Sequence, residues 1–438
     1  MTLLTSVKPN QRIKAMDVIR GFALLGILLM NIPGFSTHEF FLYWHDAIKG
    51  ETTTNGVLFS GAMILFDGKM RGLFTLLFGA GLMLFIENKQ DNSLQVADLY
   101  FKRMMWMLLF GLVDAYLLLW NGDVLYEYAM CGIFVFAFRT MKPRHMLWLS
   151  LSILAVVIYF SGSGFLERKE KYVEYKKVEQ LVKLHKPVNE KQQEAYDEFL
   201  MIKGTFLPFS KEHIHNVTES IYNREIKMKA DYLTILEKNA EELMPYHTQE
   251  FFMGMWESFV TILLGMALYK FGFFRYQIKS YVYKLFVFIG IPLGLLLSSF
   301  AVLGMAHTQD ELIHIMETRW FSVSHAGGLG RILLTVSYAS VLMLLCHVNW
   351  LNRFLSMFAN VGRMALTNYI MQTILCSLYF LGFGLNHYGE YDAKGLVIFV
   401  ICIWIIQITY SNLYFRFFKM GPLEWLWKRL TYGKGFND

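Results

Sequence analysis

Long apolar runs recur along most of this chain, and short polar segments separate them. An α-helix needs about 20 apolar residues to cross a bilayer, so runs of this length are typical of helical membrane proteins. The sequence therefore predicts an all-α polytopic membrane fold with about ten transmembrane helices. We expect these helices over residues 15–35, 57–87, 104–120, 123–138, 146–163, 251–272, 283–305, 323–346, 361–386 and 396–418.

Composition agrees with this pattern. Of the 438 residues, 55% are hydrophobic and only 17% are charged, against about 25% charged residues in an ordinary soluble domain. The mean hydropathy is +0.36. These values exclude a disordered chain, a collagen or coiled-coil rod, and a soluble globular enzyme. The cysteines lie within or at the ends of apolar runs without C-x-x-C spacing, which is typical of buried thiols; they are Cys131, Cys346, Cys376 and Cys402.

The net charge of +6 does not indicate nucleic-acid binding, because the basic residues are spread over short loops rather than gathered in one patch. Cytoplasmic loops of membrane proteins are enriched in Lys and Arg. With the N-terminus inside, the short outside segments hold only Lys49, Arg319 and Lys394. We therefore predict that both termini are cytoplasmic. The 20 basic residues of the inside segments are Lys8, Arg12, Lys14, Lys89, Lys102, Arg103, Arg139, Lys142, Arg144, Lys270, Arg275, Lys279, Lys284, Arg353, Arg363, Arg416, Lys419, Lys428, Arg429 and Lys434.

Residues 166–250 differ from the rest of the chain, because they are polar and hold 14 Lys/Arg and 16 Asp/Glu. Long polar loops can be translocated regardless of their charge. The segment also contains helix-like patches, so we predict a mostly helical extracytoplasmic insertion. It separates an N-terminal membrane half, residues 1–165, from a C-terminal membrane half with a cytoplasmic tail, residues 251–438.

Polar residues inside the apolar runs are functional candidates, because an unpaired charge in a membrane helix costs several kcal/mol. In the first helix Asp17, Arg20 and Asn31 lie on one stripe with Leu24 and Ile27, at steps of three and four residues. Asp17 and Arg20 form either a local ion pair or a phosphate site near the cytoplasmic surface, in which Asp17 orients Arg20.

Histidines follow the first helix on its outer side. His38, His45 and Asp46 stand there among aromatic residues. A histidine beside a carboxylate can act as a general base, but the segment also fits an interfacial aromatic belt with incidental histidines.

The second apolar run is interrupted by Asp67, Lys69 and Arg71 together with two glycines, Gly68 and Gly72. Such backbone is tolerated in a membrane only where it is buried in protein or lines a cavity. We predict a broken or re-entrant helix here, in which Lys69 and Arg71 can receive an anionic group.

Three later helices carry further polar residues. Asp123 and Glu127 begin the fourth helix, as a cap or as part of a site. In the eighth, His325, Arg331 and Thr335 share a face, and we expect Arg331 to pair with Asp123 or Glu127. In the ninth, Arg363 and Thr367 are four residues apart, as are Asn368 and Gln372, a spacing typical of polar contacts between helices. His213 and His215 stand in a polar loop without further clustered ligands, so we predict no metal site.

Several segments resemble the bacterial YeiB-like membrane proteins, a family described as a domain of unknown function. The resemblance covers nearly everything except residues 166–250. Its most specific parts are the D-x-x-R-G of the first helix and the GPLEWLW…LTYGK of the C-terminus. The segments are RIKAMDVIRGFALLGILLMNI, FDGKMRGLFTLLFGAG, WNGDVLYEYAMCGIF, NVGRMALTNYIMQT and GPLEWLWKRLTYGK.

The D-x-x-R-G start, with Asn31 and a loop histidine after it, is also similar to the heparan-α-glucosaminide acetyltransferase group of transmembrane acyltransferases. This resemblance implies that acyl-CoA, with acetyl-CoA as the expected donor, enters from the cytoplasm of a bacterial inner membrane. The acyl group then reaches an extracytoplasmic hydroxyl or amine of a glycan, amino sugar, peptide or lipid. The resemblance also makes a homodimer plausible. The family histidine lies in the loop after the first helix, where His45 matches best and His38 second, although Asp46 and the residues after it depart from the family's tryptophan–asparagine–glycine.

The resulting hypothesis is that His45, or His38 or His325, deprotonates the acceptor, which attacks the thioester. Asn31 or Arg331 would stabilise the oxyanion, and Asp123 completes the catalytic candidates. We assign acyl-CoA binding to Asp17, Arg20, Lys69, Arg71, Arg363 and Asn368.

Two other classes of function fit the sequence. Broken helices and intramembrane charges also suit a transporter or exporter of a small metabolite or lipid. In a scaffold or sensor, the insertion would bind an envelope partner.

Overall fold

The computed structural model describes residues 12–37, 54–87, 94–204, 211–304, 309–319 and 323–433. These residues form helices joined by short turns, and no strand occurs among them, which confirms the all-α membrane fold. The helices before the insertion, with π or 3₁₀ turns labelled η, are α1 (Lys14–Ser36), α3 (Thr54–Leu65), α4 (Lys69–Glu87), α5 (Leu94–Leu112), η2 (Val113–Leu117), α6 (Leu125–Val135), η3 (Phe136–Phe138) and α7 (Pro143–Lys183).

The insertion and the C-terminal half are helical as well. The insertion contributes α8 (Glu190–Gly204), α9 (Lys211–Met228), α10 (Tyr232–Pro245) and η4 (Tyr246–Glu250). The remaining elements are α11 (Phe251–Gly254), α12 (Trp256–Lys270), η5 (Phe273–Arg275), α13 (Ser280–Leu285), η6 (Phe286–Gly290), α14 (Ile291–Leu303), α15 (Gln309–Thr318), α16 (Val323–Leu345), η7 (Asn349–Leu351), α17 (Asn352–Arg363), α18 (Ala365–Phe380), α19 (Ala393–Tyr414) and α20 (Pro422–Tyr432).

Six of the described helices are long and apolar enough to cross a membrane, namely Lys14–Ser36, Thr54–Glu87, Pro143–Lys183, Ser280–Leu303, Ala326–Leu345 and Ala393–Tyr414. The other expected spans coincide with α5, α6, α12 and α18, which run for 11 to 19 residues. The total of about ten spans therefore stays a prediction.

The second span is broken as the sequence predicts. α3 ends at Leu65 and α4 begins at Lys69, and Gly68 between them has φ +69°. This left-handed backbone suits glycine, and a Cβ at position 68 would also overlap the Arg331 side chain. The break therefore depends on a glycine packed against an intramembrane arginine.

The ninth predicted span, residues 361–386, is also interrupted, although the apolar pattern does not mark a break there. α17 ends at Arg363, and α18 starts at Ala365 after the non-helical Met364. Arg363 and Thr367 therefore do not share one helix face, because they lie on opposite sides of this break.

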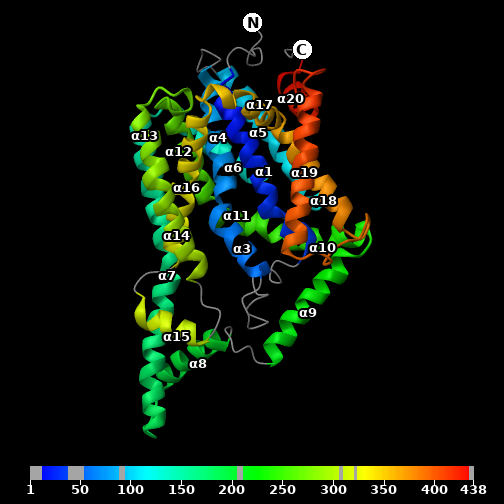
Figure 1. The fold of residues 1–438 in the computed structure, drawn as a ribbon. Coiled ribbons are helices and arrows are strands. Elements are labelled where there is room, and N and C mark those ends of the chain that lie inside the picture. Colours follow the sequence, from blue (N-terminus) through cyan, green and yellow to red (C-terminus); the bar gives the residue numbers. More distant parts are fainter. Residues whose placement is uncertain are drawn as a thin grey trace.

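The helices form one bundle around α1, α4 and α6, and α1 begins at the same end of the bundle at which α20 lies (Figure 1). α4 packs most extensively on α12, α1 on α17 and α14 on α16. One continuous apolar core includes buried residues of both membrane halves, such as Leu24, Leu76, Met266 and Cys376. The N-terminal and C-terminal halves therefore share one core and do not form two separate bundles.

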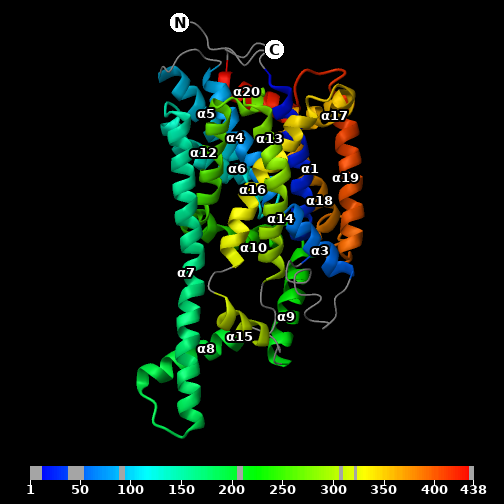
Figure 2. The same ribbon diagram turned by 60° about the vertical axis from the view of Figure 1, so that its left-hand side comes forward.

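The insertion lies at the opposite end of the bundle. α7 continues past residue 165 without a break and extends beyond the other helices, where α8 and α15 pack on it (Figure 2). Phe165, Tyr172 and Phe199 form a small core there with Leu312 and Met316. The composition changes near residue 165, but nothing in the sequence ends the helix at that point.

Glycines allow α1 and α17 to cross at very short distance. A Cβ at Gly21 would overlap the carbonyl oxygen of Phe358, and a Cβ at Gly362 would overlap that of Asp17. Small residues at helix crossings let backbones approach in membrane proteins. This crossing brings the D-x-x-R-G segment of α1 against Arg363.

We predict that Gly362→Ala separates α1 from α17 and destabilises the protein by about 1–3 kcal/mol, the usual cost of overpacking a filled interior. The matched control is Gly164→Ala on α7, because a Cβ there meets no atom within 4 Å. Thermal unfolding in detergent should show a lower Tm for Gly362→Ala alone. Equal Tm values for the two variants would contradict the close crossing.

Candidate functional site

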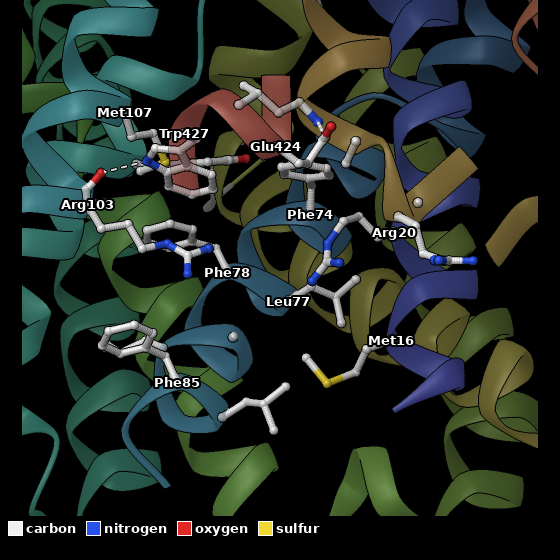
Figure 3. Close-up of a pocket in the computed structure, with 18 of the residues that line it drawn as sticks. Met16, Arg20, Phe74, Leu77, Phe78, Phe85, Arg103, Met107, Glu424 and Trp427 are labelled. Carbon is white, nitrogen blue, oxygen red and sulfur yellow. Dashed lines mark hydrogen bonds between the residues drawn. The ribbon is translucent and has the colours of Figure 1, made fainter. Parts of the chain in front are cut away.

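A cavity of about 280 Å³ lies near the end of the bundle where α1 begins. We call it the arginine pocket, because Arg12, Arg20, Arg103 and Arg363 line it. Arg20 on α1 and Arg103 on α5 reach into it from opposite sides, and α20 lies above them with Glu424 and Trp427 (Figure 3). α4 contributes an apolar wall of Phe74, Leu77, Phe78, Leu82 and Phe85.

The lining of the arginine pocket is strongly basic. Lys428 adds a fifth cation, whereas the carboxylates in the lining are Asp17 and Glu424. The pocket therefore holds three more cations than carboxylates, next to an apolar wall. Such an excess in a cleft with low-dielectric walls attracts an anion.

The arginines differ in how they are held. Asp17 accepts hydrogen bonds from Arg12 Nε at 3.2 Å and from Arg20 Nη1 at 3.1 Å. Arg363 donates to Asn360 Oδ1 at 3.1 Å and to the carbonyl oxygen of Lys419 at 3.0 Å. One carboxylate therefore orients two guanidinium groups, as the sequence suggested for Arg20.

Arg103 is held by aromatic rings instead. Its guanidinium carbon lies 4.1 Å from the ring centroid of Trp427 and 5.7 Å from that of Phe85. The indole nitrogen of Trp427 donates to the Arg103 carbonyl oxygen at 3.0 Å. The guanidinium makes no hydrogen bond or ion pair to a described residue, so its N–H groups are available to a ligand.

Glu424 fixes the start of α18 beside the pocket. Its carboxylate accepts hydrogen bonds from the backbone nitrogens of Leu366 at 2.7 Å and Thr367 at 3.1 Å, and from Thr367 Oγ1 at 2.6 Å. A carboxylate at a helix N-terminus satisfies free N–H groups and interacts favourably with the helix dipole. Burial raises the pKa of Glu424, and these hydrogen bonds oppose the rise. The contact explains why the GPLEWLW segment lies against the ninth apolar run.

Two tyrosines, Tyr128 and Tyr369, line the deep side of the arginine pocket. The Tyr128 hydroxyl lies 2.6 Å from Thr75 Oγ1, and the Tyr369 hydroxyl lies 3.4 Å from Asp123 Oδ1. Behind Tyr128 the Arg71 side chain is exposed and is within electrostatic range of Glu127 and Glu257. The tyrosines therefore connect the lining of the arginine pocket with polar groups outside it.

A second cavity, of about 390 Å³, includes Lys69, Glu257 and Arg331 in its lining. Arg331 donates from Nε to Glu257 Oε1 at 2.9 Å and from Nη2 to Glu257 Oε2 at 3.0 Å. The expected pairing of Arg331 with Asp123 or Glu127 is therefore wrong. Glu257 in the first turn of α12 satisfies the arginine, and Asp123 is buried elsewhere.

The other candidates from the sequence are dispersed. Asn368 is buried and donates to the carbonyl oxygen of Val361 at 3.2 Å and to Ser411 Oγ at 3.0 Å, so it connects helices rather than lining the arginine pocket. Asn31 is half-buried on α1. His38 and His45 lie outside the described residues. His325 belongs to the first turn of α16, but its side chain is outside the described part of the chain.

Sequence reasoning missed several polar groups. Asp114 and Glu257 are charged residues within apolar runs, and this is the same feature that marks Arg331 as a functional candidate. Arg103 was counted only as a loop charge. On the opposite end of the bundle His387 Nδ1 lies 2.6 Å from Glu390 Oε2, in a turn that the apolar pattern does not mark.

Comparison with known proteins shows what the chain is similar to. A family model described as "Protein of unknown function (DUF418)" matches residues 268–434. The uncharacterized protein YxaH of Bacillus subtilis (strain 168) is 28% identical over 99% of this chain and 97% of its own length. The uncharacterized protein YeiB of Escherichia coli (strain K12) is 27% identical over 96% of each chain. The chain is therefore similar to YeiB-like proteins along nearly its whole length. No solved structure matches this YeiB-like chain significantly.

In this YeiB-like protein the Arg331–Glu257 pair offers a direct test of the geometry. We expect Arg331→Met and Glu257→Met each to destabilise the protein by about 2 kcal/mol, because each leaves a charged hydrogen-bonding partner unpaired. The double variant should lose less than the sum of the two. Denaturation in detergent measures the coupling, and additive losses would contradict the pairing.

Proposed function

We propose that this YeiB-like protein is a transmembrane acyltransferase. It would take an acyl group from cytoplasmic acyl-CoA, with acetyl-CoA the expected donor, and pass it to an extracytoplasmic hydroxyl or amine. The protein would lie in the bacterial inner membrane with both termini in the cytoplasm.

The observation that carries this proposal is the arginine pocket. Its excess of cations suits the phosphate groups of coenzyme A, since guanidinium groups bind phosphate through charge-assisted, often bidentate hydrogen bonds. Asp17 holds Arg20 in place, and Arg103 has N–H groups to offer on the opposite side. Both lie toward the end of the bundle that the basic loops assign to the cytoplasm.

The depth of the pocket supports acyl transfer rather than phosphate binding alone. An acyl-pantetheine arm entering along Phe74 and Phe78 would point at Tyr128 and Tyr369. Arg71, Glu127 and Asp123 lie beyond these tyrosines. α1 itself runs from Asp17 and Arg20 at this end of the bundle to Asn31 near the other end, so one helix carries polar side chains toward both ends.

Lys69 and Arg71 fit the binding of the acceptor better than the binding of coenzyme A, because neither lines the arginine pocket. Lys69 lines the second cavity with Arg331, and Arg71 is exposed behind Tyr128. We therefore assign coenzyme binding to Asp17, Arg20, Arg103 and Arg363.

We predict that Arg103→Gln weakens the binding of coenzyme A at least tenfold, because it removes a charge-assisted contact worth about 1.5–3 kcal/mol. The matched control is Lys102→Gln, since the neighbouring Lys102 is exposed and pairs with Asp98. Isothermal titration of the detergent-solubilised protein with coenzyme A measures both. Equal affinities for the two variants would contradict this coenzyme site.

The reaction itself is tested with labelled acetyl-CoA and the release of free coenzyme A thiol. We expect turnover by the wild-type protein and its loss in at least one of His45→Ala, His38→Ala and His325→Ala, because the proposed base removes the proton of the acceptor. Full activity in all three variants would exclude each of these histidines as the base. Binding of acetyl-CoA without any turnover or acyl transfer would instead favour a transporter or exporter.

A further inference from the structure

Two carboxyl groups lie together in the interior, behind the arginine pocket. Asp114 is fully buried in the π-helical turn η2, and Asp123 follows it in the turn before α6. Asp114 accepts a hydrogen bond from Thr373 and Asp123 accepts one from Tyr369, and these two residues are one turn apart on α18, so the two carboxyls lie close together. Neither forms an ion pair with a cation among the described residues.

The pair is incompletely satisfied. Asp114 Oδ2 accepts a long hydrogen bond from Thr373 Oγ1 at 3.4 Å, whereas Asp114 Oδ1 has no hydrogen-bond partner among the described residues. Asp123 Oδ2 accepts from the backbone nitrogen of Tyr126 at 2.8 Å. A buried acceptor without a donor is costly, and a proton on one carboxyl would supply the missing donor.

The backbone around the pair is also unusual. A π-helical turn interrupts the end of α5 at Asp114, and Leu119 has a left-handed φ of 65°. π turns often occur at functional sites. Left-handed backbone at a residue other than glycine costs of order 1–3 kcal/mol and concentrates at such sites. Both unusual backbone features therefore lie within five residues of a carboxyl of the pair.

Electrostatics then limits the charge of the pair. Two carboxylates in contact inside a low-dielectric interior cannot both be ionised, so they share one proton. Thr373 and Tyr369 face the pair from α18, the backbone nitrogen of Tyr126 donates to Asp123, and Tyr246 of η4 is within electrostatic range of Asp123.

Tyr369 connects the pair with the arginine pocket. Its hydroxyl accepts from the backbone nitrogen of Val124 at 3.2 Å and lies 3.4 Å from Asp123 Oδ1, while its side chain lines the pocket. We propose that Asp114 and Asp123 form a proton-relay pair that holds one proton and exchanges it with the arginine pocket through Tyr369.

This role rests on the proposed acyl transfer. In that reaction the acceptor's O–H or N–H bond breaks, its O or N forms a bond to the acyl carbon, and the carbon–sulfur bond breaks. The proton released on the acceptor side must end on the thiolate of coenzyme A on the pocket side. The singly ionised pair adjoins the pocket through Tyr369 and can take up that proton and return one through the Tyr369 hydroxyl, with no net change of protons.

Infrared spectroscopy tests whether the pair holds a proton, without any substrate. Asp114→Asn/Asp123→Asn should lack one carbonyl band of a protonated carboxylic acid that the wild-type protein shows at neutral pH. The control Asp98→Asn, which alters an exposed carboxylate on α5, should keep it. If the double variant fails to fold, Asp123→Asn replaces it, because its amide can donate to the Asp114 carboxylate and should also abolish the band. An unchanged band would overturn the proposal.

Turnover of acetyl-CoA tests the relay. We expect Asp114→Asn/Asp123→Asn to lower kcat by about 100-fold, the usual contribution of acid–base groups, while the Kd for coenzyme A stays unchanged. The decline of wild-type activity at acidic pH, where the pair becomes fully protonated, should disappear. Wild-type kcat in the double variant would overturn the relay. A wild-type protein without turnover would overturn the acyltransferase and the relay, while the infrared band would still decide whether the pair holds a proton.

Discussion

A charged side chain inside an apolar helix bundle must be paired, hydrogen-bonded or hydrated, and this requirement organises the interior of the protein. Arg12 and Arg20 share Asp17, Arg331 binds Glu257 through two hydrogen bonds, and Glu424 uses free N–H groups at the start of α18. The Arg331–Glu257 pair and the Glu424 contact therefore each fix one helix relative to another, whereas Asp17 holds two arginines at the start of α1. The interior is divided into polar regions rather than crossed by scattered charges.

Close backbone contacts decide where these polar regions form. Gly21 and Gly362 let α1 and α17 touch, and Gly79 and Gly265 do the same for α4 and α12, since a Cβ at any of them would overlap a carbonyl oxygen of the facing helix. Asp17, Arg20 and Arg363 stand directly beside the first of these crossings. The residues of the D-x-x-R-G segment therefore serve packing and the pocket at once.

The helical fold, the broken second span and the ion pair of Asp17 with Arg20 could be predicted from the sequence, because apolar runs and isolated charges are local features. The partners of the charges could not. Glu257 is 74 residues from Arg331, and Glu424 is 58 residues from Leu366, so these contacts depend on the packing of helices that the pattern does not specify. The break at Met364 could not be predicted either, because it depends on a distant contact: the Glu424 carboxylate of α20 stabilises the start of α18. His45 and His38 carry predictions that the described residues do not test.

The arginine pocket also shows why the two membrane halves cannot act separately. Arg20 and Arg103 come from the first half, whereas Arg363, Tyr369 and Glu424 come from residues 268–434, the part that the family model matches. The apolar core crosses the same division. A C-terminal half alone would keep the contact of Glu424 with the start of α18, but it would lack Asp17, Arg103 and the apolar wall of α4. Any ligand that binds in the arginine pocket therefore contacts both halves, and its binding energy would stabilise their association.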